Sequence, residues 1–536
     1  MTSPEVDRRQ FVKQLLQAAS ASAVAANLDW NATASLAAAP NPVIGLDLLL
    51  DESIGTIKPA LYGHFAEHIG GVIYDGIWVG PDSKVPNVDG IRRDLIDHVK
   101  RLGKVVVRWP GGCFADKYHW RDGIGPREKR PRRFGRWREE TEPNHFGTHE
   151  FIHFCRLCDV EPYFAANVGT GTAEEFQQWV EYCNAPAGRT TLADERVSNG
   201  DSAPFGVRYW GVGNESWGCG GKFTPEDYCV EYRKYTEWVP GFEVPLYLIA
   251  AGPNGPDLDW SRRFFKKWLD YTRAPLNAWA LHYYCGTTGH ALKFTHDQWY
   301  EMLQKANRME TLIQDHWRVM GEFDKPHQVK LVIDEWGAWH PEGTEINKRH
   351  LFEQMGCLRD ALVAALTLDT FNRHADKIDM ANVAQLVNNL HSLFLADGDQ
   401  FVATPSFHVF EMYRPHHGAK SVRLEIQSPE VEFQASGITQ KIFRVAGSAS
   451  VSAKKATLTL VHTHVTEPAE VAIKLHGGSA VEVSASVLSH TTLNAHNTFE
   501  QPNTVVPRAK TVAAQGTDLR FTLEPASVTR LEIQLA

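Results

Sequence analysis

Hydrophobic and polar residues follow two different patterns along the chain of 536 residues. Between about positions 55 and 400, short apolar runs alternate with stretches long enough to hold a helix. The eight runs are LYGHFAE, GKVVVRWPGG, EPYFAANVGTG, VRYWGVGNE, PLYLIAAGPN, AWALHYY, VKLVIDEWG and KIDMANVAQ. Near-continuous apolar strands that alternate with helices are typical of a parallel sheet covered on both faces. The eight units predict an α/β fold, a (β/α)8 TIM barrel over residues 56–415.

A period-two pattern replaces this alternation near the C-terminus. After about position 416, the runs SVRLEIQ, KIFRVAG, ATLTLVHTHV, AVEVSASVLSH and TRLEIQLA alternate in polarity, and long helical patterns disappear. Such runs predict a C-terminal antiparallel β-sandwich over residues 416–536. The run NPVIGLDLLLD precedes the barrel, and we expect residues 40–55 to add a strand to the sandwich rather than to the barrel.

Residues 1–39 have the pattern of an export leader. Arg8 and Arg9 precede the letters QFVK and an Ala-rich, weakly apolar run, which is the order of a bacterial twin-arginine signal. We therefore expect export by the twin-arginine route to the periplasm or the cell exterior. The apolar run is too short and too rich in Ser to span a bilayer, so we expect no membrane insertion. Two stretches of small residues leave the cleavage point open.

Composition and charge narrow the class of protein further. A formal net charge of −9 argues against nucleic acid or an anionic membrane as the main partner. Eight cysteines in so long a chain do not form a disulfide scaffold, and Cys155 and Cys158 fall in a helical apolar pattern that predicts buried thiols. No His-Glu-x-x-His spacing or comparable ligand cluster occurs in the sequence, so we expect neither a metal nor a cofactor.

The ends of the apolar runs carry an unusual number of polar side chains. In a barrel of this kind the active site lies at the carboxyl ends of the strands. Few of these residue types are needed to finish a strand, so we expect them to form a site. The residues concerned are Glu67 and His68, Arg108, Asn167, Asn214 and Glu215, His282 to Tyr284, Asp334 and Glu335, and Asn382 and Gln385.

Glu215 and Glu335 have the properties of a catalytic pair. They follow the fourth and seventh runs, whose ends face each other across the mouth of an eight-stranded barrel. A retaining glycosidase needs two carboxyl groups about 5–5.5 Å apart, one as a nucleophile and one as an acid/base. Arg108 could keep the nucleophile ionised, and Asn214 could bind a sugar hydroxyl.

Simpler interpretations exist for each of these residues. Glu215 could begin a helix or form a structural ion pair, and Glu67 could be the salt-bridge partner of Arg108. His68 and His282 are more often structural than catalytic, because a two-carboxylate mechanism needs no imidazole. The pairing of Glu215 with Glu335 at opposite strand ends favours the catalytic interpretation.

Several segments of the chain resemble glycoside hydrolase family fifty-one, chiefly α-L-arabinofuranosidases. The segments are YGHFAEHIGGVIYDGIW, VRWPGGCFADKYHWRDGIGP, FGTHEF, GNESWGCGG, IDEWG and MANVAQLVN, which occur in the order of that family. The resemblance implies a retaining mechanism with Glu215 as acid/base and Glu335 as nucleophile. It also implies that a furanose is bound by Glu67, Arg108, Asn214, Tyr284, Gln385 and Trp137, with Cys113 where many members carry Asn.

The resemblance implies an arabinose-containing oligo- or polysaccharide as the substrate, with removal of terminal non-reducing α-L-arabinofuranosyl residues. The family is often oligomeric, which favours a homo-oligomer. Another activity of the same clan, an endo-β-glucanase or a β-xylosidase, would use the same carboxylates with a different pocket. A third interpretation is a non-catalytic carbohydrate-binding barrel, which the presence of both carboxylates disfavours.

Overall fold

A closed barrel of parallel strands forms the centre of the protein. The computed structural model describes residues 43–135, 137, 141–271, 274–286, 288–348, 350–512 and 516–536, so the leader expected at 1–39 lies outside the described residues. The barrel strands are β2 (Gly63–Phe65), β5 (Val106–Trp109), β8 (Glu161–Ala166), β9 (Tyr209–Val212), β10 (Tyr247–Ala250), β11 (Ala278–Cys285), β12 (Lys330–Ala338) and β13 (Ile378–Ala384). They close in the order β10-β11-β12-β13-β2-β5-β8-β9, which confirms the TIM barrel.

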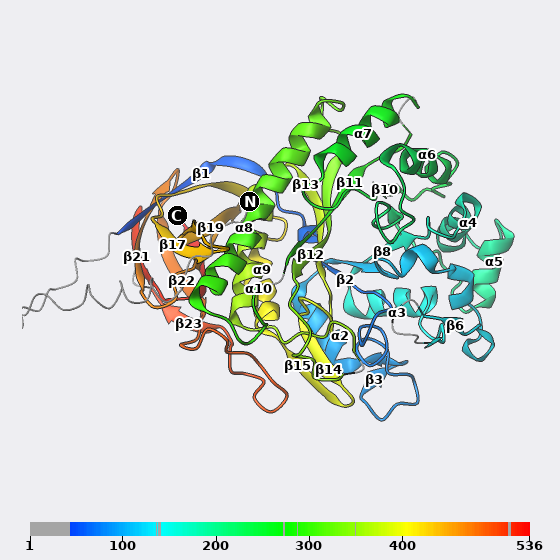
Figure 1. Cartoon of the computed structure of the whole chain (residues 1–536), viewed down its shortest axis with the longest axis horizontal. Coiled ribbons are helices and arrows are strands. Elements are labelled where there is room, and N and C mark those ends of the chain that lie inside the picture. Colours follow the sequence, from blue (N-terminus) through cyan, green and yellow to red (C-terminus); the bar gives the residue numbers. More distant parts are fainter. Residues whose placement is uncertain are drawn as a thin grey trace, which may run out of the picture. The chain divides into compact units, whose positions relative to one another are not determined.

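Helices connect consecutive barrel strands and cover the outside of the barrel (Figure 1). One helix or more separates each barrel strand from the next in the described chain, and a last helix follows β13. The helices are α2 (Arg93–Leu102), α3 (Thr148–Cys158), α4 (Ala173–Asn184), α5 (Thr191–Ser198), α6 (Pro225–Thr236), α7 (Leu258–Leu269), α8 (His296–Gly321), α9 (Leu358–Arg373) and α10 (Pro405–Tyr413). Cys155 and Cys158 are buried in α3, as predicted.

Helix α7 illustrates how the sequence specifies these helices. The Asp257 side chain caps its start by accepting a hydrogen bond of 3.0 Å from the Trp260 backbone N–H. Aromatic residues recur at helical spacing on its buried face, and the rings of Phe264 and Phe265 lie 4.3 and 5.2 Å from that of Trp279 on β11. Burial of each such ring contributes about 1.5–3 kcal/mol, so packing on the barrel holds the helix in place.

Short elements complete the barrel domain. Two-stranded sheets pair β3 (Asn87–Val88) with β4 (Ile91–Arg92), β6 (Arg133–Phe134) with β7 (Thr141–Glu142), and β14 (Phe394–Asp397) with β15 (Gln400–Ala403). The 3-10 helices are η1 (Pro59–Tyr62), η2 (Ala115–Lys117), η3 (Trp120–Gly123), η4 (Arg127–Lys129) and η5 (Arg414–His416). Both η2 and the β6–β7 hairpin belong to the long connection between β5 and α3, which begins at the carboxyl end of β5.

The C-terminal part forms a nine-stranded sheet within the described residues. Its strands are β1 (Ile44–Thr56), β16 (Lys420–Ile426), β19 (Val445–Ser452), β20 (Lys455–His462), β21 (Ala469–His476), β22 (Ala480–Leu488), β23 (Arg508–Thr511), β24 (Asp518–Leu523) and β25 (Ser527–Leu535), beside the hairpin of β17 (Glu430–Ala435) and β18 (Ile438–Phe443). The pairs are antiparallel except β1 with β21. Side chains from both ends of the strand order, among them Phe521 and Val487, share one core, so the sheet folds over itself.

Helix α9 joins the barrel to this sheet through buried polar contacts. The Asp369 carboxylate accepts hydrogen bonds of 2.7 Å from Ser448 Oγ and 2.6 Å from Thr459 Oγ1. One turn further, Asn372 Nδ2 donates to Ser448 Oγ at 3.0 Å and Asn372 Oδ1 accepts from Tyr62 OH at 2.6 Å. Because unpaired buried polar groups are costly, these matched groups fix how the sheet meets the barrel.

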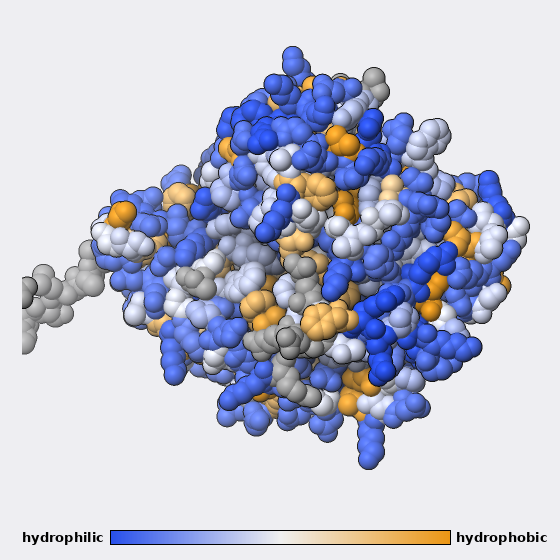
Figure 2. Space-filling view, turned by 45° about the vertical axis from the view of Figure 1, so that its right-hand side comes forward, coloured by the Kyte–Doolittle hydropathy of each residue, from blue (hydrophilic) through white to orange (hydrophobic). Residues whose placement is uncertain are grey.

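Few large hydrophobic side chains of the described residues are exposed. Figure 2 shows a face on which hydrophobic residues are scattered among hydrophilic ones. No helix among the described residues is both long enough and apolar enough to cross a membrane.

Candidate active site

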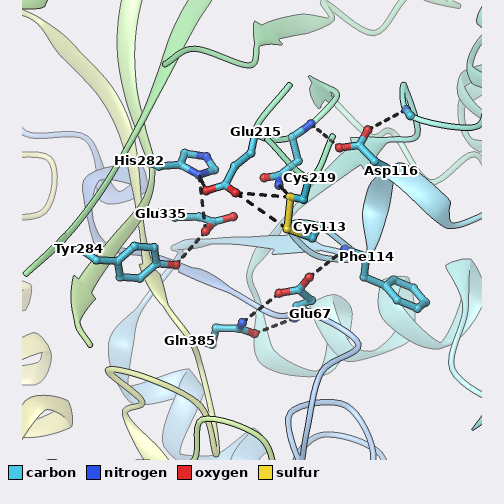
Figure 3. Close-up of a disulfide and its surroundings, with 12 residues drawn as sticks. Glu67, Cys113, Phe114, Asp116, Glu215, Cys219, His282, Tyr284, Glu335 and Gln385 are labelled. Atoms are coloured by element: carbon cyan, nitrogen blue, oxygen red, sulfur yellow. Dashed lines mark hydrogen bonds and ion pairs between the residues drawn. A yellow bond between two sulfur atoms is a disulfide. The ribbon is translucent and has the colours of Figure 1, made fainter. Parts of the chain in front are cut away.

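Polar side chains from the carboxyl ends of several barrel strands converge in one place (Figure 3). The alternation of a β-strand explains how Arg108 reaches it. On β5, Val106 belongs to the cluster inside the barrel, whereas Val107 and Trp109 pack outward with the helices. Arg108 therefore points inward as Val106 does, and its side chain is fully buried beneath the mouth of the barrel.

A β-bulge on β12 brings two consecutive acidic residues to the site. The pairing of β12 with β11 shifts after Leu281, and His282 then pairs with Glu335, which leaves Asp334 as the extra residue. A bulge re-aims the side chains beside it. Asp334 consequently lies 3.4 Å from Arg108 Nε, and Glu335 also directs its carboxylate toward the guanidinium of Arg108.

Glu335 is held as a buried carboxylate. Arg108 Nη1 donates to its Oε1 at 2.8 Å, and Tyr284 OH donates to its Oε2 at 2.8 Å. Burial favours the neutral acid, yet the charges of His282 and Arg108 together with these hydrogen bonds outweigh burial and lower the pKa of Glu335 below its ordinary value. Glu335 is therefore ionised at neutral pH, which is the state a nucleophile needs.

Glu215 lies at the end of β9 and faces Glu335. One oxygen of each carboxylate and Nδ1 of His282 all lie within 4.8 Å of one another. His282 Nδ1 is 3.1 Å from Glu215 Oε1 and 3.6 Å from Glu335 Oε2. Burial opposes protonation of His282, but the charges of Glu335 and Glu215 outweigh it and raise the imidazole pKa. The side chain of Glu215 is 20% exposed against 7% for Glu335, so Glu215 is the carboxylate that water reaches.

Asn214 is fixed from two sides. Arg108 Nη2 donates to Asn214 Oδ1 at 2.7 Å, and Asp116 Oδ2 accepts the backbone N–H of Asn214 at 3.0 Å. Asp116 Oδ1 accepts a further backbone N–H, that of Val168, at 2.9 Å. Asp116 is not among the residues predicted from the sequence, where its only signal is an acidic residue shortly after the PGGC turn. Its buried carboxylate ties the loops after three strands together.

Glu67 is joined to Gln385 rather than to Arg108. Gln385 Oε1 accepts the Glu67 backbone N–H at 2.9 Å, Gln385 Nε2 donates to Glu67 Oε2 at 3.3 Å, and Phe114 N–H donates to Glu67 Oε1 at 2.9 Å. Within the described residues, the ion pairs of Arg108 are with Asp334 and Glu335. Burial and the charge of Glu335 raise the pKa of Glu67 to about 8. Glu67 is therefore largely protonated at neutral pH.

Cys113 is bonded to Cys219 in a disulfide that bridges 106 residues of sequence. Both sulfur atoms lie near the acid/base candidate, Cys219 Sγ at 3.4 Å and Cys113 Sγ at 3.9 Å from Glu215 Oε2 (Figure 3). Sequence reasoning named Cys113 as a sugar contact and missed Cys219, because nothing in the spacing of the two residues indicates that they meet. A contact between Cys113 and a sugar stays a prediction.

His68 and Trp137 lie beside the loop that follows β5. His68 Nδ1 is 2.7 Å from Glu142 Oε2, and its ring stacks on Phe114, whose N–H binds Glu67. His68 is thus a buried residue that supports the loop after β5. Trp137 lines a cavity of about 40 Å³ together with His68 and Phe114, and its contact with substrate stays a prediction.

Two groups of side chains in the described chain have spacings that could hold a metal ion. They are Glu215, His282 and Glu335, and Cys113, Glu215 and Cys219. In the second group the two sulfur atoms are bonded to each other. In the first, both oxygens of Glu335 already accept hydrogen bonds from Arg108 and Tyr284. Both groups contain Glu215, so neither marks a site separate from the carboxylate pair.

Comparisons with known proteins identify the family. The α-L-arabinofuranosidase 1 domain matches residues 98–288, and the α-L-arabinofuranosidase C-terminal domain matches residues 334–527. An intracellular exo-α-L-arabinofuranosidase of Bacteroides ovatus is 36% identical over 90% of this chain and 94% of its own. An intracellular exo-α-(1→5)-L-arabinofuranosidase of Bacillus subtilis is 29% identical over 90% of this chain and 97% of its own. The crystal structure of the GH51 arabinofuranosidase from Xanthomonas axonopodis pv. citri has a TM-score of 0.87 and 36% identity, and covers 92% of this chain and all of that one.

The expectation of export to the periplasm or the cell exterior is wrong. The relatives from Bacteroides ovatus and Bacillus subtilis are both named as intracellular enzymes. An arginine pair before an Ala-rich run is a weak signal, because the run is only weakly apolar, whereas the central region of a signal peptide is apolar. Extensive similarity at both the sequence and the structural level shows that the chain belongs to the α-L-arabinofuranosidases of glycoside hydrolase family 51.

Proposed function

We propose that the protein removes terminal non-reducing α-L-arabinofuranosyl residues with retention of configuration. The observation that carries this proposal is the approach of the two carboxylates, with oxygens of Glu215 and Glu335 within 4.8 Å. Inverting glycosidases keep their carboxyl groups about 6.5–9.5 Å apart to admit a water molecule between them, whereas retaining enzymes keep them about 5–5.5 Å apart. The short separation supports double displacement through a covalent glycosyl-enzyme.

In the first step, Glu335 attacks the anomeric carbon and Glu215 donates its proton to the departing glycosidic oxygen. The bond from the anomeric carbon to that oxygen breaks as the bond to Glu335 forms. Arg108 and Tyr284 support the assignment of Glu335, because they hold its carboxylate ionised and orient it. Their hydrogen bonds engage one oxygen each, and each carboxylate oxygen has a second lone pair with which it could attack the sugar.

In the second step, Glu215 removes a proton from water, and that water displaces Glu335 from the sugar. The greater exposure of Glu215 supports this role, since its carboxylate must meet a water molecule that enters after the leaving group departs. His282 contacts both carboxylates, so it stays beside Glu215 both when Glu215 carries its proton and when it is ionised. We therefore assign it to positioning Glu215 rather than to proton transfer to the sugar.

The furanose is bound by the polar residues around this pair. We propose that Asn214 binds the 2-hydroxyl and that Glu67 and Gln385 bind hydroxyls on the other side of the ring. The mutual hydrogen bonds of Glu67 and Gln385 support this role, because they set the direction of both side chains before substrate arrives. Cys113 and Trp137 are proposed to complete the contacts.

The substrate proposed is an arabinose side chain of hemicellulose or pectin. The names of two relatives support exo attack on an α-L-arabinofuranoside. We further propose that residues 56–415 act as the catalytic domain, that 40–55 and 416–536 form the sheet domain, and that the enzyme is a homo-oligomer. Sedimentation velocity would test the last point, and a monomer at micromolar concentration would contradict it.

A panel of aryl glycosides tests the function. The enzyme should hydrolyse an aryl α-L-arabinofuranoside and leave aryl β-glucoside, aryl β-xyloside and a soluble β-glucan largely intact. Cleavage of the glucan or the xyloside in preference would indicate the other clan activities. Binding of polysaccharide without release of any sugar would indicate a non-catalytic barrel. Glu335→Ala should abolish turnover of every substrate that the native enzyme cleaves.

A further inference from the structure

A disulfide crosses the mouth of the barrel beside the acid/base residue. Cys113 follows β5 and Cys219 follows β9, and their Cα atoms lie 5.6 Å apart. The strands β5 and β9 are not neighbours, because β8 lies between them in the barrel. The bond therefore connects loops that the hydrogen bonds of the sheet do not join directly.

The disulfide supports one oxygen of the Glu215 carboxylate. Oε1 faces His282 Nδ1 at 3.1 Å, whereas Oε2 rests against Cys219 Sγ at 3.4 Å and Cys113 Sγ at 3.9 Å (Figure 3). A disulfide sulfur has no proton to donate, so it restrains this oxygen by contact. The carboxylate is thus held between an imidazole and a sulfur pair.

The backbone of Glu215 also needs support from outside its own residue. Its φ is +40°, in the left-handed region that residues other than Gly rarely adopt. Such conformations persist where the surrounding structure fixes them. The Glu215 carbonyl accepts hydrogen bonds from Gly218 N–H at 2.7 Å and Gly220 N–H at 3.1 Å, and Cys219 lies between these two glycines. A Cβ on Gly220 would lie 1.8 Å from the Asn214 carbonyl oxygen, so this close turn requires glycine at position 220.

We propose that the Cys113–Cys219 disulfide is a positioning element for the acid/base carboxylate, and that its reduction selectively impairs protonation of the leaving group. This inference rests on the proposed function. A dithiol reductant attacks one sulfur, the S–S bond breaks, two cysteine thiols form and the reductant becomes a disulfide, so two electrons and two protons are transferred. Both cysteines are half-buried, so a small reductant can reach the bond.

Reduction removes the support of Glu215 without removing its carboxylate. Two thiols cannot remain at bonding distance, so the loops after β5 and β9 separate and Oε2 loses its contact with sulfur. Glu335 keeps its hydrogen bonds from Arg108 and Tyr284, because neither donor lies on those two loops beyond the strand ends. Proton donation should therefore suffer more than nucleophilic attack.

The dependence on leaving group distinguishes this role from simple stabilisation. The measurement is kcat/KM for 4-nitrophenyl α-L-arabinofuranoside, whose leaving group needs little protonation, and for an α-1,5-linked arabinobiose, whose leaving group needs it fully. Because misplacement by about 1 Å can cost about 100-fold, reduction with dithiothreitol should lower kcat/KM for arabinobiose by about ten- to a hundredfold. The value for the aryl substrate should change by less than about threefold, and reoxidation should restore both.

Two variants serve as controls. Cys219→Ser breaks the disulfide but keeps the Cys113 side chain, which is proposed to contact the sugar; it should show the selective loss without reductant and should not respond to dithiothreitol. Cys155→Ala combined with Cys158→Ala alters the buried thiols of α3, keeps the disulfide, and should respond as the native enzyme does. If the serine variant does not fold, the reduced and reoxidised native enzyme decides the question alone.

Equal losses for both substrates on reduction, or no loss for either, would overturn the proposal. So would alkylation of Cys113 and Cys219 in protein that had been oxidised, detected by mass spectrometry, because it would show that no disulfide forms. Failure of the oxidised native enzyme to cleave either α-L-arabinofuranoside would instead contradict the proposed function, which separates the two outcomes.

Discussion

Replacing Tyr284 with Phe removes the hydroxyl that donates to Glu335 Oε2 at 2.8 Å and leaves the ring in place. A hydrogen bond to a charged group contributes about 1.5–3 kcal/mol, and about 1.36 kcal/mol corresponds to one pKa unit. The hydroxyl is one of the groups that lower the pKa of Glu335. Its loss should raise that pKa by about 1–2 units and lower kcat/KM by about 10- to 100-fold.

The pH profile of kcat/KM for an aryl α-L-arabinofuranoside measures this effect. The nucleophile must be ionised, so a higher pKa of Glu335 moves the acidic limb of the profile to higher pH. Tyr283→Phe is the matched control, because the Tyr283 hydroxyl donates to the Lys305 carbonyl at 2.8 Å instead. An unmoved acidic limb in Tyr284→Phe, or the same shift in Tyr283→Phe, would refute the reasoning.

Three further changes test other parts of the structure. Arg108→Met leaves Glu335 without its buried partner and should destabilise the fold by about 3–5 kcal/mol in urea denaturation; an unchanged midpoint would contradict this. Because the pKa of Glu67 is raised to about 8 in the folded protein, the free energy of unfolding falls as pH rises between about 4.5 and 8, by about 1.4 kcal/mol per pH unit. Glu67→Gln does not titrate, so the stability that it gains over the native protein should be larger at pH 8 than at pH 5. A gain independent of pH would contradict that origin. Asp369→Ala removes the acceptor of two buried hydroxyls and should cost about 1–3 kcal/mol, seen as a lower Tm; an unchanged Tm would show that these contacts do not hold the sheet.

The barrel and part of the site could be predicted from the sequence because they depend on local patterns. Each apolar run is buried on both faces, so its length and composition identify a strand without knowledge of its neighbours. Residues at the end of an apolar run must lie at the carboxyl end of a strand, so the sequence predicts that Arg108 and Glu215 lie at the mouth of the barrel. The many Trp residues illustrate the limit of composition. Their number does not say where each one lies, and Trp109, Trp210 and Trp336 are fully buried core residues.

Features that depend on pairing between strands could not be predicted. The bulge that turns Asp334 and Glu335 inward together exists only in the register of β12 against β11. Cys113 and Cys219, which form the disulfide, are 106 residues apart in the sequence. Asp116 accepts a hydrogen bond from the backbone N–H of Asn214, which is 98 residues away. Nothing in the local spacing of these residues encodes such contacts.

Azide rescue of Glu215→Ala tests the assignment of the two carboxylates most directly. This variant should react with a substrate that has a good leaving group and form the glycosyl-enzyme on Glu335. The glycosyl-enzyme should then accumulate, because no base activates water. Azide needs no base, so it should restore turnover and give an arabinofuranosyl azide of retained configuration, identified by NMR. Rescue of Glu335→Ala instead, with an azide of inverted configuration, would contradict the account.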